Sequence, residues 1–178
     1  MKKILIFLGI FTFSILAFGV NDKDEKEVIV TAEFMAPITI ETTDADFGTI
    51  IAQSYSKGNF PSTNSGDNGA KNGTLTIKGD GQVFISWKDK NSSGDFEPSW
   101  DKLNIKLKKD GDNSGSAPTL DSQFWITDGI KNSIHNIIAD EKGTKLNVVG
   151  ELTNVTSNTP SGTYSGAITI RVSYDDSL

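Results

Sequence analysis

The residue types and spacing that could do chemistry gather first in an acidic stretch between residues 110 and 121. Oxygen-bearing side chains occupy its first, third, fifth and twelfth positions, supplied by Asp110, Asp112, Ser114 and Asp121. Calcium takes six to eight oxygen ligands, and calcium-binding loops space them in this way, with glycine at the sixth position. The pattern therefore makes these four residues a candidate calcium loop.

The same stretch also fits a solvated hairpin turn. An aspartate stands where calcium loops usually carry a bidentate glutamate, Pro118 stiffens the segment, and strand-like rather than helical sequence flanks it. We favour the turn, and we expect no metal and no other cofactor.

Enzymatic chemistry finds little support in the remaining residues. His135 is the single histidine, and no Gly-x-Ser-x-Gly element supplies a nucleophile for it. Cysteine is absent, which removes thiol catalysis and zinc–thiolate sites. We therefore expect no catalytic residues and no enzyme.

Three tryptophans raise a glycan-binding interpretation, because aromatic platforms on β-sandwiches can hold sugars. Trp87 shares the inward face of its strand with Val83 and Ile85, so we expect it in the core. Trp125 alternates with Phe124 and is predicted to be exposed, and a surface tryptophan equally well contacts a loop or a subunit. The position of Trp100 stays open.

Alternating hydrophobicity sets the elements that must position these residues. From Tyr164 to Tyr174 the alternation is unbroken, which predicts one long strand with a buried and a wet face, in an inner sheet position or with a partner. Similar runs predict strands over residues 74–78, 82–88, 102–108, 123–127 and 145–152. The glycines of 79–81 predict a hairpin between the first two runs.

These runs indicate an all-β sandwich of about seven to nine strands, with a closed barrel as the alternative. One segment is ambiguous: the isoleucines of residues 130–140 fit a short helix as well as a loop or a pair of strands. The polar residues 58–73 predict a long surface loop.

The first 19 residues read as an export signal. Lys2 and Lys3 precede an apolar run that ends near Ala17-Phe18-Gly19, and this run is shorter than the about 20 residues that a membrane span needs. We expect cleavage after Gly19, a secreted protein, and no membrane span in the mature chain. Loss of two bases leaves 15 against 23 acids, a net charge of −8, which argues against nucleic acid as a partner.

Residues 20–36 are predicted to be a charged leader followed by an N-terminal arm, ahead of a β-sandwich domain over residues 37–178. The arm alternates and ends before Pro37, which cannot donate to a strand ladder. Its apolar face marks it as a candidate donor strand for subunit interaction, through Val28, Val30, Ala32 and Phe34.

Several segments together resemble the bacterial domain-of-unknown-function 4402 family. The similarity lies in residues 37–40 and 44–50, in the strand and glycine of residues 73–79, and in the closing segments 148–152 and 161–174. The long polar loops at 58–73 and 108–121 depart from that family.

The same features resemble colonisation-factor-class chaperone–usher pilins, which have an alternating arm, a proline, no cysteine and a Gly-x-Tyr-Ser-Gly final strand. This resemblance implies an immunoglobulin-like, pilin-like sandwich that lacks one strand and is completed by the arm of the next subunit. The expected protein is thus a structural subunit of a fimbria-like surface fibre that passes through the periplasm to the cell surface. Expected partners are like subunits, a periplasmic chaperone and an usher. A monomeric secreted binding module for calcium or glycan is the alternative.

Overall fold

The computed structural model describes residues 35–52, 60–111 and 116–175. Over these residues the chain forms ten β-strands and one short 3-10 turn (Asp67–Gly69), with no α-helix. The all-β prediction is confirmed, with slightly more strands than expected. None of the described residues forms a helix that is long and apolar enough to cross a membrane.

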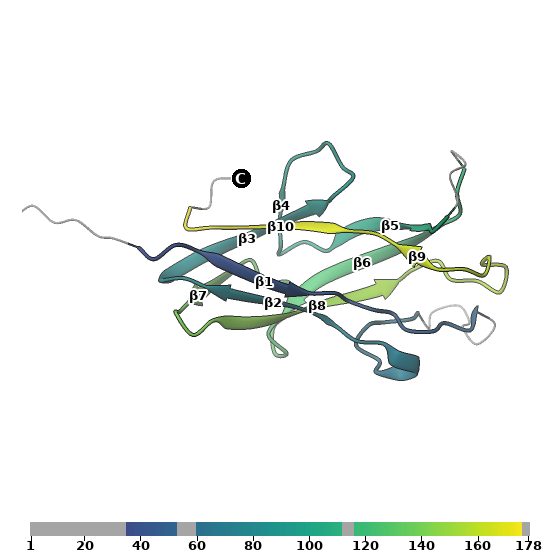
Figure 1. The fold of residues 1–178 in the computed structure, drawn as a ribbon, viewed down its shortest axis with the longest axis horizontal. Coiled ribbons are helices and arrows are strands. Elements are labelled where there is room, and N and C mark those ends of the chain that lie inside the picture. The colour runs from purple at the N-terminus through teal and green to yellow at the C-terminus, as the bar shows by residue number, and fades with distance from the viewer. Residues whose placement is uncertain (1–34, 53–59, 112–115, 176–178) are drawn as a thin grey trace, which may run out of the picture. The chain divides into compact units, whose positions relative to one another are not determined.

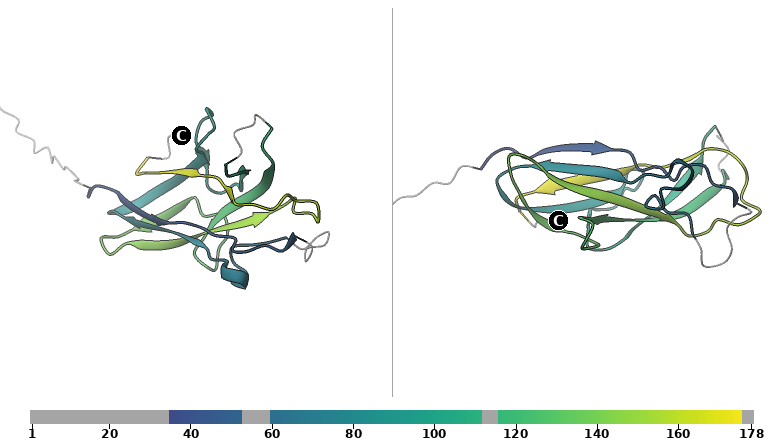
Figure 2. Two further views of the ribbon diagram at one scale, coloured as in Figure 1. Left: turned by 45° about the vertical axis from the view of Figure 1, so that its right-hand side comes forward. Right: turned by 90° about the horizontal axis from the view of Figure 1, so that it is seen from below.

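The strands make two antiparallel sheets that pack as an immunoglobulin-like sandwich (Figures 1 and 2). The larger sheet runs in the order β1 (Thr39–Thr43), β2 (Gly73–Lys78), β8 (Thr144–Leu152), β6 (Thr119–Thr127), β5 (Leu103–Lys109) and β9 (Tyr164–Ser165). The smaller sheet runs in the order β10 (Ile168–Ser173), β3 (Gly81–Asp89) and β4 (Glu97–Pro98), and β7 (Asn136–Ala139) also pairs with β3.

The core lies between the sheets and follows the period of two in the sequence. In β5, Leu103, Ile105 and Leu107 are buried, while the residues between them are exposed. In β3, the predicted inward residues are completely buried, and they include Trp87. Because alternate side chains of a strand point to opposite faces, each sheet contributes one apolar face to the core.

One local prediction is wrong, and one alternative that the sequence left open is decided. The turn at residues 79–80 does not close a hairpin, because β2 pairs with β1 and β8 whereas β3 pairs in the other sheet. This turn therefore carries the chain from one sheet to the other. The ambiguous isoleucine segment contains the strand β7 rather than a helix, and Ile130 and Ile138 are exposed.

The C-terminal run is also not one uninterrupted strand with one buried face. It divides into β9, which pairs with β5, and β10, which pairs with β3, so the chain changes sheets between Ser165 and Ile168. Gly166 lies at this change, where a Cβ atom would come within 2.8 Å of Leu107 Cδ2. The absence of a side chain lets the backbone pass this close to the core.

All six residues of β10 are half-buried, so neither face of this strand is sealed. The strand pairs on one side with β3 and forms an edge of the smaller sheet. The expected inner position is therefore not observed in the described chain.

The alternation of buried and half-buried residues in β2 can be tested by substitution. Ile77 is fully buried between the sheets, so Ile77→Ala should lower the free energy of unfolding by about 2–5 kcal/mol. The neighbouring Thr76 points to the opposite face, and Thr76→Ala should cost under about 1 kcal/mol. Denaturant unfolding of both variants measures the difference, and equal losses would contradict the facing of this strand.

Candidate functional site

The structure does not bring together the ends of the candidate calcium loop. Asp121 lies in β6 opposite Lys106 of β5, and Asp110 follows β5 four residues further on. At about 3.3 Å per residue, this offset separates the two aspartates by roughly 13 Å along the ladder. Asp112 and Ser114 lie outside the described residues.

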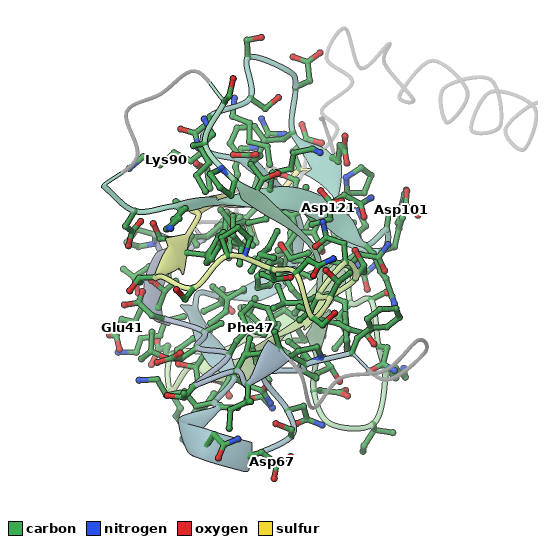
Figure 3. All side chains as sticks on the ribbon, turned by 90° about the vertical axis from the view of Figure 1, so that its right-hand side faces the viewer. Glu41, Phe47, Asp67, Lys90, Asp101 and Asp121 are labelled. Atoms are coloured by element: carbon green, nitrogen blue, oxygen red, sulfur yellow. The ribbon has the colours of Figure 1, made fainter. Side chains whose placement is uncertain are left out.

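Protein groups already bind both aspartates. Lys106 Nζ lies 3.1 Å from Asp121 Oδ1, and Asn154 Nδ2 donates to Asp121 Oδ2 at 3.1 Å. Ser165 Oγ donates to Asp110 Oδ1 at 2.5 Å. Over the described residues no group of three or more acids or histidines could hold a metal ion, and Asp67, Asp101 and Glu41 lie well apart in Figure 3.

The lone histidine occupies a packing position. His135 is buried, and its Nδ1 lies 2.8 Å from the carbonyl oxygen of Ile85. Its ring contacts the rings of Trp100, at 4.3 Å between centroids, and Phe84, at 5.7 Å. These contacts hold β7 and the segment after β4 against β3.

The other tryptophans are divided between interior and surface. Trp87 is in the core as predicted, and Trp125 is half-buried beneath Lys102 Nζ, which lies 4.7 Å from its ring centroid. Trp100 is 52% exposed, so it is the tryptophan that could meet an external ligand.

A groove of about 1270 Å³ lies among the described residues. This volume exceeds the range of about 300–1,000 Å³ that holds small ligands. One wall comes from β1 and the segment that follows it, and the other comes from β9, β10 and the loop before them. The floor consists of core residues of the larger sheet: Ile105, Leu107, Leu120, Phe124, Val148 and Leu152.

The groove lies between two strand edges. β1 ends the larger sheet and β10 ends the smaller one, and within the described chain each pairs on one side. Both strands are drawn along the long direction of the sandwich in Figure 1. Register with β2 and β3 gives them opposite directions, because β1 begins and β10 ends beside the β2–β3 turn.

The walls of the groove combine apolar with polar residues, and their apolar side chains are not sealed from water. Ile168 and Ile170 of β10 are half-buried and line it, and Ile40 of β1 is 39% exposed. Fully burying side chains of this size contributes about 1.5–3 kcal/mol each. A strand placed between β1 and β10 would bury these side chains and could hydrogen-bond to both edges.

The sequence alone did not reveal the groove, because its walls come from segments about 125 residues apart that carry no shared motif. The feature of the sequence that pointed to such a groove was the predicted N-terminal arm, because its apolar face would need a surface to cover it. The predicted interaction residues of that arm, Val28, Val30, Ala32 and Phe34, lie outside the described residues. So does the predicted signal segment.

No family model matches this chain, and no curated protein matches it. The two resemblances stated above therefore stay predictions.

A calcium titration tests the acidic stretch. Because Asp121 is held by Lys106 and Asn154 on the β5–β6 hairpin, millimolar calcium should leave the melting temperature unchanged. Scanning calorimetry with calcium or with chelator measures this. A calcium-dependent rise that Asp112→Ala removes would contradict the turn interpretation.

Proposed function

We propose that this protein is an exported structural subunit of a fimbria-like surface fibre that assembles by β-strand addition. The observation that carries the proposal is the groove between β1 and β10: its wall holds the half-buried Ile168 and Ile170, and within the described chain each of the two bordering strands pairs on one side. In this role the protein has no catalytic step. Its partners are like subunits, with a periplasmic chaperone and an usher during export to the cell surface.

The chemistry of strand addition fits both components. Backbone hydrogen bonds to a sheet edge supply affinity whatever the sequence, and alternate side chains fill the pockets beneath. The arm over residues 28–36 alternates apolar and polar side chains, and nine extended residues span about 30 Å. A strand of this pattern can place one face on the floor of the groove and the other in solvent.

Exchange between subunits produces a fibre when the contact is head-to-tail. The donor and the acceptor are different surfaces of one chain, so each added subunit presents a new unfilled groove or a new free arm. Such a contact does not close on itself unless its rotation forms a ring. Repetition of a single contact is therefore sufficient for growth.

The first test is assembly of the mature chain. It should form concentration-dependent, heat-resistant multimers, because each inserted arm completes the core of a neighbour. Val30→Asp places a charge on the inserted face and should block assembly, whereas Thr31→Asp on the opposite face should be tolerated. Analytical ultracentrifugation separates these outcomes, and a wild-type chain that stays monomeric at high concentration would overturn the proposal.

A mixing experiment isolates donor from acceptor. Ile168→Asp puts a carboxylate on the wall of the groove, so this variant should keep its arm but lose its acceptor site. Mixed with Val30→Asp, which keeps its groove, it should give heterodimers and no longer species. Failure of the two monomeric variants to pair would show that arm and groove are not partners.

A glycan-binding module remains a second candidate because of Trp100. Its half-exposed ring packs against the buried His135. An aromatic ring fixed in this way could serve as a stacking platform for a sugar. If this candidate is correct, Trp100→Ala should abolish binding on a glycan array and Trp125→Ala should not. Absence of binding by the wild-type chain would remove this candidate.

A further inference from the structure

Tyr174 ties three segments together at one end of the sandwich. Its hydroxyl donates to the carbonyl oxygen of Ala36 at 2.6 Å and accepts the backbone N–H of Asp80 at 2.9 Å. Ala36 is the last residue of the arm, Asp80 lies in the β2–β3 turn, and Tyr174 directly follows β10. One hydroxyl group thus fixes the point where the arm joins the domain.

The β2–β3 turn packs closely against this hydroxyl group. A Cβ atom on Gly79 would lie 2.9 Å from Tyr174 Oη, so the turn comes close because it carries no side chain there. The ring packs on the core in line with the inward residues of β10. The lining of the groove includes Ile168 and Ile170 but, among the described residues, does not extend to Tyr174.

A chain that filled its own groove would have to reverse direction next to this contact. The arm enters β1 beside the β2–β3 turn, so its return would make a tight hairpin with β1. Two-residue hairpins favour glycine or asparagine at positive φ, and residues 34–38 contain neither. Pro37 also restricts Ala36 to extended conformations.

We propose that Tyr174 is a positioning residue that directs the arm away from its own groove and toward that of another copy. This inference rests on the proposed function. Reversal at Ala36 and Pro37 would rotate the Ala36 carbonyl away from Tyr174 and break the 2.6 Å hydrogen bond. The hydrogen bond therefore opposes insertion within one chain and leaves insertion between chains unaffected.

Cross-linking distinguishes the two routes, because the chain has no cysteine of its own. Thr31→Cys labels the polar face that the alternating sequence predicts for the arm, and Glu41→Cys labels an exposed position of β1. A short bis-maleimide then links arm to groove in the mature chain. Denaturing gels separate links within a chain, which run as monomer, from links between chains, which give a ladder.

In the chain that carries the two cysteines, wild-type Tyr174 should give a ladder of between-chain links on the gel. Tyr174→Phe keeps the ring and removes the hydroxyl group, and it should raise the ratio of within-chain to between-chain links roughly fivefold, the factor of one net hydrogen bond. Thr144→Val is the matched control. It also removes a hydroxyl group, one that donates to the carbonyl oxygen of Ile138 at 3.1 Å, and Thr144 does not line the groove. This control should leave the ratio of within-chain to between-chain links unchanged. If loss of any hydrogen bond of the domain changed the ratio, the control would change it as well.

The outcomes separate this inference from the proposed function. A wild-type ladder with an unchanged ratio in Tyr174→Phe overturns the role of Tyr174 and leaves strand exchange standing. Wild-type links confined to single chains, or absent, overturn strand exchange itself. If circular dichroism shows that Tyr174→Phe does not fold, the double variant Ala36→Asn and Pro37→Gly decides, because it supplies a hairpin turn at the same place. An unchanged ratio in that variant overturns the inference.

Discussion

Burial of one apolar core between two sheets is the constraint on which this structure depends, and along one line this core is bordered by a groove. β1 and β10 border the groove, buried residues of the larger sheet form its floor, and the half-buried Ile168 and Ile170 lie in its wall. Apolar surface in contact with water costs about 25 cal/mol per Å² relative to burial. Unpaired strand edges add unsatisfied backbone groups that favour pairing with another strand. Both effects act at the same place and would be relieved by the same object, an extended amphipathic segment.

Much of the fold could be predicted from the sequence, because a period of two is a local property of a strand. Leu75 and Ile77, or Leu103 and Ile105, specify which face is buried whatever the partner strand. Sheet membership is not local, and there the predictions failed. Gly166 looks like one more residue of an alternating run, yet it marks a change of sheet, because the deciding contact is with Leu107, far away in the chain. The predicted hairpin at residues 79–80 is wrong for the same reason, because the pairing partners of β2 and β3 lie in different sheets.

The chemistry predicted from spacing depended on the same non-local information. Asp110 and Asp121 have the spacing of calcium ligands only if the segment between them curls into a loop. In the structure β5 ends directly before that segment and β6 begins within it at Thr119, and the register that pairs Asp121 with Lys106 holds the two carboxylates apart. Lys106 and Asn154 then satisfy Asp121 without a metal. For the tryptophans, periodicity placed Trp87 correctly but could not place Trp100, which lies beyond the end of a two-residue strand.

The direction of the chain at Ala36 bears on the function that we propose for the groove. Ala36 and Tyr174 meet beside the β2–β3 turn, whereas the groove walls extend from Ile40 past β1 and from Ile170 back past β9. Ala36 thus lies before the first residue of β1, and the groove extends from Ile40 past the other end of this strand. In the proposed strand exchange, the donor and the acceptor would be different surfaces and would not be related by a twofold axis. Contacts of this kind are heterologous, and when their rotation does not close they repeat without limit. For the proposed strand exchange, such a head-to-tail contact would supply the polarity that a fibre needs.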